Sequence, residues 1–226
     1  ARKVRPRQLN FMNGDIVRIG GKHLDAGGYD VLGVITGSEG LLGVITEVTV
    51  RILQKPETAK AVLLGFDSNQ KGGDCVAAII ADGIIPGGME MMDTFAIQAA
   101  EEFVHAGYPQ DVTALLIVEL DGPAPEVEHL IGRVETIARQ QNARYVKVSE
   151  SEDERQKFWS GRKAAFPAVG RLSPDYLCMD GTIPRGQLAY VLTRMEELSE
   201  KYGLRVANVF HAGDGNLHPL ILFDAN

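Results

Sequence analysis

Short apolar runs alternate with segments of helical periodicity through most of this chain, and this alternation is the strongest constraint on its fold. Apolar runs predict strands at 61–66, 89–92, 112–120, 144–148, 205–211 and 217–223. Amphipathic patterns predict helices at 69–82, 94–105, 126–141, 151–165 and 187–202. Few of the connections are long enough for the crossovers that parallel strands require. The pattern therefore predicts an α+β fold, with helices covering one face of an antiparallel sheet.

The first 55 residues follow a different pattern, which is rich in β-branched residues. We predict strands at 15–19, 29–36 and 44–53. The polar stretch 54–58, with Pro56 at its centre, then indicates a boundary. The sequence thus predicts one unit over residues 1–56 and a second over 57–226.

Composition and charge exclude several classes of protein. The net charge of −7, from 23 basic and 30 acidic residues, argues against a nucleic-acid partner and an anionic membrane surface. No apolar run approaches the roughly 18 residues of a transmembrane segment, and the N-terminus does not read as a signal peptide. Two cysteines, Cys75 and Cys178, do not form a disulfide framework. We therefore expect a cytoplasmic protein, and the lack of an initiating Met indicates a piece of a longer chain.

A glycine-rich turn, TGSEGLLGVITE, spans residues 36–47. It matches neither of the usual phosphate-binding templates, and a β-branched strand follows it where those motifs require a helix. Such a turn reflects either the conformational freedom of glycine alone or the close approach of another backbone or a planar ligand. The residues themselves leave both interpretations open.

An arginine flanked by aromatic residues lies in the segment FWSGRKAAF. Trp159 and Arg162 share one face of the predicted helix because they are three residues apart. The planar guanidinium of Arg162 is suited to bidentate capture of a carboxylate. The alternative is a surface arginine that rests on Trp159 in a cation–π contact without any ligand.

The octapeptide HAGDGNLH, residues 211–218, combines a turn signal with two imidazoles. Asp214 and Gly215 predict a two-residue hairpin turn, which would place His211 directly opposite His218 with Cβ atoms about 5 Å apart. This spacing suits chelation of a divalent ion, although a longer loop would change the register. A zinc-type site also requires a third protein ligand. None is obvious, because Asp214 is better explained as a turn residue.

Together these segments resemble one family. GSEGLLGVITEVTV is similar to the last segment of the FAD-binding domain in flavoproteins of the vanillyl-alcohol oxidase type. HAGDGNLHPLILFD resembles the metal motif in the cap domain of their D-2-hydroxyacid dehydrogenase branch. Three further segments are similar to parts of the catalytic flavoprotein subunits of bacterial glycolate oxidases, namely GIIPGGMEMMD, FVHAGYP and residues 158–185. The resemblance covers nearly the whole chain.

The resemblance implies oxidation of a 2-hydroxy acid to the 2-keto acid, with hydride passing to FAD. Arg162 matches the arginine that holds the substrate carboxylate. His211 and His218 match two ligands of a divalent metal (Zn, Mn or Fe) that lowers the pKa of the substrate hydroxyl. The residues that would lie against FAD are Gly37, Ser38, Glu39, Gly40, Gly43, Val44 and Ile45.

Two departures from the family pattern refine this hypothesis. Branches that use dicarboxylic hydroxy acids have polar residues where this chain has Phe166, Cys178 and Leu220, which favours glycolate or D-lactate. The family also begins before position 1, with a loop that cradles the FAD pyrophosphate. It continues beyond position 226 to a Gly-Glu-His-Gly segment that supplies the third metal ligand and the general base. We therefore expect residues 1–226 to combine the incomplete end of an FAD-binding domain with an incomplete cap domain, and to be inactive alone.

The resemblance implies other glycolate oxidase subunits as electron-transfer partners, which would hold the protein peripherally at the inner membrane. Two other classes of protein remain as alternatives. A metal-dependent hydrolase would use His211 and His218 with a third ligand inside the chain, such as Asp180 or Glu150. A non-catalytic interaction module would tolerate the loss of both histidines.

Overall fold

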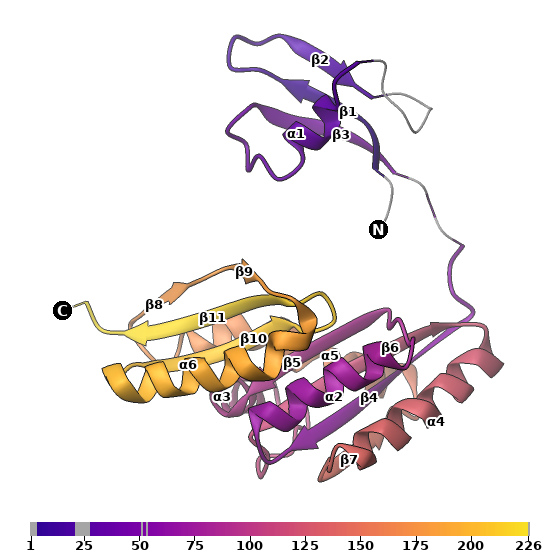
Figure 1. Cartoon of the computed structure of the whole chain (residues 1–226), viewed down its shortest axis with the longest axis vertical. Helices are drawn as coiled ribbons and strands as arrows, with labels where there is room; N and C mark the ends of the chain where they lie inside the picture. Colours follow the sequence, from indigo (N-terminus) through magenta and orange to yellow (C-terminus); the bar gives the residue numbers. More distant parts are fainter. Residues whose placement is uncertain (1–3, 21–27, 51, 53, 226) are drawn as a thin grey trace. The chain divides into compact units, whose positions relative to one another are not determined.

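A computed structural model of the chain describes residues 4–20, 28–50, 52 and 54–225. The chain divides into two compact units, Ala1–Lys55 and Pro56–Asn226 (Figure 1). The division falls within the polar stretch at which the sequence predicts a boundary.

The first unit contains a three-stranded antiparallel sheet. Its strand order is β2 (Ile16–Ile19), β1 (Val4–Asn10) and β3 (Val44–Val50). The central strand, β1, is not among the strands that the sequence predicts. Leu9 and Ile35 are the only fully buried large apolar side chains among the described residues of this unit.

One predicted strand of the first unit is wrong. The segment 29–36 contains a short helix, α1 (Val31–Ile35), instead of a strand. The Asp30 side chain caps this helix by accepting a hydrogen bond from the backbone N–H of Gly33 at 2.9 Å. A short apolar run is compatible with either a buried strand or a helix turn, so periodicity alone could not decide.

The second unit is built on one eight-stranded sheet in which every neighbouring pair is antiparallel, as predicted. The strand order is β7 (Tyr145–Val148), β4 (Thr58–Phe66), β6 (Ala114–Gly122), β5 (Gly88–Asp93), β10 (Arg205–His211), β11 (Asn216–Phe223) and β8 (Asp175–Cys178), and the short β9 (Gly181–Thr182) also pairs with β11.

Helices cover both faces of this sheet, so the prediction that they cover one face is wrong. One apolar cluster joins the sheet to α2 (Asn69–Ala81), α4 (Ala124–Gln140) and α6 (Leu188–Tyr202). A second cluster, on the opposite face, joins it to α3 (Thr94–Val104) and α5 (Glu152–Val169) (Figure 1). Consecutive strand residues such as Leu63 and Leu64 are both buried, because alternate side chains enter opposite clusters.

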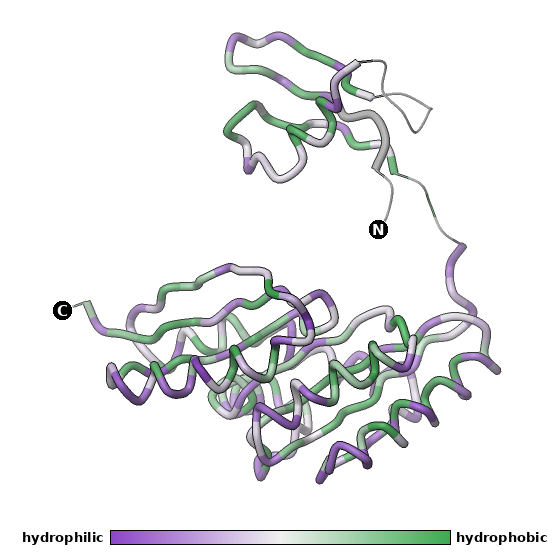
Figure 2. The backbone as a smooth tube through the Cα atoms, in the orientation of Figure 1, coloured by the Kyte–Doolittle hydropathy of each residue, from purple (hydrophilic) through white to green (hydrophobic). Residues whose placement is uncertain are grey.

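Along the helices, hydrophilic and hydrophobic residues alternate with each turn, as amphipathic packing requires (Figure 2).

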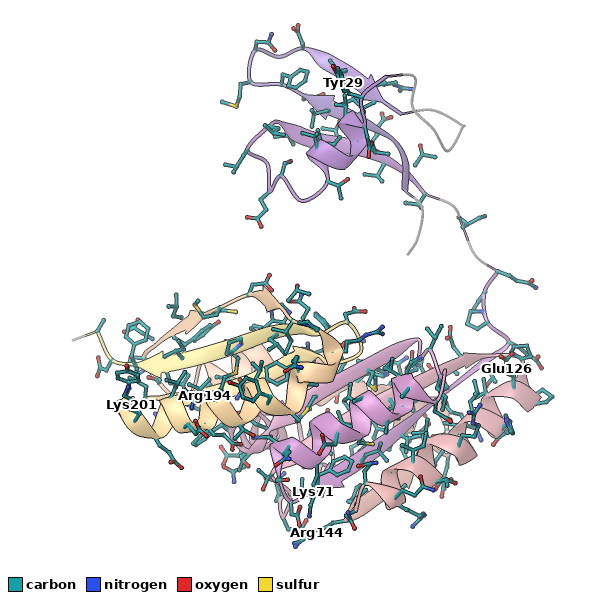
Figure 3. The ribbon with its side chains drawn as sticks, in the orientation of Figure 1. Tyr29, Lys71, Glu126, Arg144, Arg194 and Lys201 are labelled. Atoms are coloured by element: carbon teal, nitrogen blue, oxygen red, sulfur yellow. The ribbon has the colours of Figure 1, made fainter. Side chains whose placement is uncertain are left out.

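At one end of the sheet, Asp67 forms ion pairs with Lys71 at 2.7 Å and Arg144 at 3.1 Å, and these two cations lie close together in Figure 3. The hydrogen bond from Lys71 lowers the pKa of the Asp67 carboxyl. None of the described helices is both long and apolar enough to cross a bilayer.

The position of α5 is fixed by its ends and by one close contact. Ser151 caps its N-terminus by accepting a hydrogen bond from the backbone N–H of Glu154 at 3.2 Å. The helix continues to Val169, beyond the predicted end, and includes Pro167. Gly161 lies against the ring of Tyr108, where a Cβ atom would stand 2.4 Å from a ring carbon. Helix α5 can therefore approach Tyr108 this closely only because residue 161 has no side chain.

Candidate functional site

Four polar side chains gather on the face of the sheet that α3 and α5 cover. Glu90, His211 and His218 each lie two positions along a strand from a member of the apolar cluster on that face. Their side chains therefore leave the sheet on the same side as that cluster. Arg162 reaches them from α5. The site thus combines β5, β10, β11 and one helix.

Glu90 lies at the centre of this group. Its Oε2 accepts a hydrogen bond from Nε of Arg162 at 2.9 Å, and its Oε1 lies 2.8 Å from Nδ1 of His211. Arg162 and Glu90 are only 8% and 9% exposed, so the pair satisfies two charges that would otherwise be buried alone. Among the described residues, the two terminal nitrogens of Arg162 have no hydrogen-bond partner. The forked end of this arginine is therefore available to a ligand.

The two histidines meet edge to face. Their ring centroids are 5.0 Å apart and their planes make an angle of 88°. Nδ1 of His211 faces Glu90, and Nδ1 of His218 lies 3.4 Å from Oδ1 of Asp180. Burial lowers the pKa of His218, which favours the neutral imidazole that binds metal ions. Because a carboxylate lies beside each Nδ1, the Nε2 atoms are the available metal donors.

The hairpin that carries the histidines differs from the predicted one. His211 pairs with Asn216 and His218 pairs with Val209, so residues 212–215 form a four-residue loop. A two-residue turn of the type typical for Asp-Gly requires a positive φ at both positions, but only Gly215 has one (+73°). The backbone N–H groups of Asp214 and Gly215 both donate to the carbonyl of His211 instead. The register is shifted by two residues, which leaves both imidazoles on the same face.

The surroundings of the site decide between some of the sequence-based alternatives. Arg162 is buried and pairs with Glu90, and it makes no cation–π contact with Trp159, whose indole donates to Glu119 at 2.5 Å. The predicted alternative of a surface arginine that rests on Trp159 is therefore wrong. Phe166 contacts His218, with ring centroids 6.0 Å apart. Cys178 pairs with Leu220 across β8 and β11, on the face that carries His218.

A third metal ligand is not supplied by this part of the chain. In residues 4–20, 28–50, 52 and 54–225, no three His, Cys, Asp or Glu side chains are grouped closely enough to hold a metal ion. Asp180 lies beside His218, but its side chain is 72% exposed. Glu150 is an exposed residue just before α5. The third ligand that a hydrolase requires is therefore not found among the described residues.

The glycine-rich turn has two kinds of glycine. Gly37 and Gly40 have φ values of +81° and +83°, and a Cβ atom built on either would meet nothing within 4 Å. At Gly43 a Cβ atom would stand 2.9 Å from the carbonyl oxygen of Asn10. Packing inside the unit thus explains Gly43, whereas Gly37 and Gly40 leave open space beside the backbone. Ser38 and Glu39 lie in the turn, and Val44 and Ile45 begin β3.

Glu90 is the site residue that sequence reasoning missed. It occurs in the predicted strand at 89–92, where the other three residues are methionines. A lone carboxylate in an otherwise apolar strand could have signalled a buried ion pair, because an unpaired charge is rarely buried. Its partners are 72 and 121 residues away along the chain, so no local pattern names them.

Comparison with known proteins assigns the chain that carries this site to a family. Residues 55–226 match the family described as "FAD linked oxidases, C-terminal domain". The chain therefore belongs to this family, as the resemblance of its motifs predicts, and the α+β fold class is confirmed.

Among individual proteins, the chain is 56% identical over 219 residues to the glycolate oxidase subunit GlcD of Escherichia coli (strain K12). This alignment covers 97% of the chain and 44% of that protein. The Bacillus subtilis (strain 168) subunit GlcD is 36% identical, with 96% of the chain and 46% of that protein covered. The chain thus spans less than half the length of these curated relatives.

Solved structures share the fold at low sequence identity. The chain superposes on 4-ethylphenol oxidase from Gulosibacter chungangensis with a TM-score of 0.69 at 13% identity, covering 97% of this chain and 51% of that one. A structure of p-cresol methylhydroxylase gives a TM-score of 0.69 at 14% identity, covering 98% and 51%. These similarities concern the fold alone.

Proposed function

We propose that this chain contributes substrate-binding and flavin-facing parts of an enzyme that oxidises a small 2-hydroxy acid to the 2-keto acid. The observation that carries the proposal is the open fork of Arg162 beside two histidines with available Nε2 atoms. The relatives support the chemistry. They include two glycolate oxidase subunits and, at 29% identity, the D-lactate dehydrogenase [cytochrome] of Arabidopsis thaliana.

Arg162 binds the substrate carboxylate in this proposal. Its Nε is already bonded to Glu90, so the guanidinium is held with its two terminal nitrogens free. These nitrogens match the two oxygens of a carboxylate in spacing and charge. The clamp fixes one end of the hydroxy acid and leaves its C2 hydroxyl to be oriented by the rest of the site.

His211 and His218 are proposed to hold a divalent metal ion (Zn, Mn or Fe) through their Nε2 atoms. The pair fits such an ion, because both rings present nitrogen donors on one face, Nδ1 of His211 is hydrogen-bonded to Glu90, and Nδ1 of His218 lies 3.4 Å from Asp180. When bound, the ion lowers the pKa of the substrate hydroxyl. We place the third ligand and the general base outside residues 1–226, in the Gly-Glu-His-Gly segment that the family resemblance implies.

The glycine-rich turn is proposed to lie against FAD, which accepts the hydride when it is bound. The open space beside Gly37 and Gly40 is compatible with a planar ring system at this backbone. Ser38, Glu39, Gly43, Val44 and Ile45 complete the proposed contact. Residues 1–226 alone are expected not to retain FAD tightly and to be inactive. A yellow preparation of this chain that glycolate reduces would contradict that expectation.

The walls of the site favour a small substrate. Phe166 stands at the edge of His218, and Leu220 and Cys178 lie on the same face. None of these side chains offers a cation to a second carboxylate, so we propose glycolate or D-lactate. We further propose that partner subunits carry electrons onward and hold the protein peripherally at the membrane, because the relatives named GlcD are subunits.

The test replaces Arg162 by Ala in the full-length flavoprotein and uses Lys163→Ala, at an exposed lysine on the same helix, as a control. Two charge-assisted hydrogen bonds are lost, so kcat/KM for glycolate or D-lactate should fall on the order of 100- to 1000-fold, with a raised KM and an unchanged flavin content. The control should keep kcat/KM within about twofold. Loss of flavin with Arg162→Ala would instead assign that arginine a structural role.

A further inference from the structure

Glu90 is a shared acceptor that joins the two halves of the site. One oxygen of its carboxylate meets Nε of Arg162 and the other meets Nδ1 of His211, at 2.9 and 2.8 Å. The Glu90 side chain is buried, and it reaches both groups from β5, which neither of them shares. A displacement of Glu90 would therefore move the arginine and the histidine together.

The hydrogen-bond directions at Glu90 fix a proton on His211. Arg162 remains protonated in proteins, so its Nε–H donates to Oε2. The Oε1 atom of the carboxylate can only accept, which requires a proton on Nδ1 of His211. The lone pair of the neutral ring then resides on Nε2. This is the tautomer that binds a metal ion through Nε2.

Glu90 also balances charge at the site. Without it, the Arg162 guanidinium would be a buried cation close to the position proposed for a divalent ion, and like charges destabilise each other in a desolvated site. The negative charge of Glu90 offsets the charge of Arg162 and leaves the terminal nitrogens of the arginine unoccupied.

We propose that Glu90 is a positioning residue that sets the tautomer of His211 and the orientation of Arg162 with a single carboxylate. Its consequence for catalysis rests on the proposed function, whereas its effect on the His211 tautomer does not.

Glu90→Gln is the decisive variant because it keeps the size of the side chain and removes one acceptor. A glutamine has one carbonyl oxygen and one amide nitrogen. If the oxygen stays with the charged Arg162, the amide donates to Nδ1 of His211, and the ring proton must move to Nε2. Glu90→Asp keeps two acceptor oxygens and should largely retain the original tautomer.

Glu119→Gln is a matched control on the same sheet face. Glu119 accepts hydrogen bonds from Arg155 of α5 and, at 2.5 Å, from Nε1 of Trp159, and it makes no hydrogen bond or ion pair with any of the described histidines. It therefore reproduces a glutamate bridge between the sheet and α5 without the proposed role.

The experiment measures histidine tautomers by long-range 1H–15N NMR on the ¹⁵N-labelled chain at about pH 8, above the ordinary histidine pKa of about 6.5. His211→Gln identifies the His211 signals among the five histidines of the chain. We expect the Nδ1–H tautomer in the unsubstituted chain, in Glu90→Asp and in Glu119→Gln, and the Nε2–H tautomer in Glu90→Gln. An unchanged His211 tautomer in Glu90→Gln would overturn the proposal.

A Zn²⁺ titration of the same samples by calorimetry provides a second measurement. Glu90→Gln should weaken Zn²⁺ binding by about 10- to 100-fold, as loss of an oriented histidine partner does in metal sites, while Glu119→Gln should leave it unchanged. Equal affinities in Glu90→Gln and the unsubstituted chain would contradict the positioning role. If the tautomer responds but neither the chain nor the full-length flavoprotein binds Zn²⁺, the metal assignment of the proposed function fails and the inference about Glu90 stands.

Discussion

Helix α5 carries two arginines that both reach a glutamate on the sheet, yet the two differ in how completely the protein uses them. Arg155 donates to Glu119 through Nη1 and to Glu152 through Nε and Nη2, so each of its nitrogens has a partner. Arg162 donates to Glu90 through Nε, and its terminal nitrogens have no partner in the described part of the chain. The comparison teaches that unfilled hydrogen-bonding capacity, rather than burial or pairing, separates a candidate ligand-binding arginine from a structural one.

The largest effect that tests this comparison concerns stability. Arg155→Ala removes bonds to two glutamates and leaves Glu119, which is 19% exposed, with only the neutral indole N–H of Trp159. We expect the free energy of unfolding to fall by about 3 kcal/mol, measured by urea denaturation. Arg162→Ala should cost less, because it removes one bond and Glu90 keeps His211 as a partner. A larger stability loss for Arg162→Ala would reverse the assignment of the two arginines.

A smaller effect is expected where the helix segment between the two arginines meets Tyr108. Gly161→Ala forces a methyl group against that ring, so the free energy of unfolding should fall by about 2 kcal/mol. Gly132→Ala on α4 is the control, since nothing lies within 4 Å of the added Cβ. That change should stabilise the chain by about 0.5–1 kcal/mol, because alanine favours a helix interior. If both changes stabilise the chain, α5 does not pack on Tyr108 as described.

The smallest effect extends the comparison from the arginines to the carboxylates. Asp93, three residues after Glu90, accepts hydrogen bonds from the backbone of Ala96 and from Asn208 but has no cationic partner among the described residues. Burial raises the pKa of Asp93 to about 7, so the folded chain holds a proton that the unfolded chain has already lost. The free energy of unfolding should therefore fall as pH rises, by about 1 kcal/mol between pH 6 and 8.

Denaturation of the unsubstituted chain and of Asp93→Asn at these two pH values isolates the contribution of Asp93. The variant should lose the fall, because asparagine does not titrate and can still cap α3. A pH dependence that survives the substitution would assign the effect to another group.

Most of the secondary structure of the second unit follows from the sequence because its strands and helices have strong periodicity. Helix α2, for example, begins and ends within one residue of the prediction. The predicted strand at 29–36 of the first unit is wrong for a physical reason, since a short apolar run fits both a strand and a helix turn and the cap at Asp30 favours the helix. The covering of both sheet faces also escaped prediction, because it depends on contacts between distant segments.

The candidate site was predictable to the extent that its chemistry is local. The spacing of His211 and His218 places them on one face, and Arg162 stands out beside Trp159. The role of Glu90 depends on strand pairing and on the packing of α5 against the sheet, which no short motif encodes. The assignment of the FAD contact at 37–45 remains a prediction.

The even-numbered register shift at the histidine hairpin has an evolutionary consequence. Because side chains alternate between the faces of a strand, a slip of β11 against β10 by two residues keeps the two imidazoles on one side. A slip by a single residue would turn one imidazole toward the apolar cluster under α2 and α6. The pairing register of these strands should therefore vary less in evolution than the length of the four-residue loop, which can change while His218 stays paired with Val209.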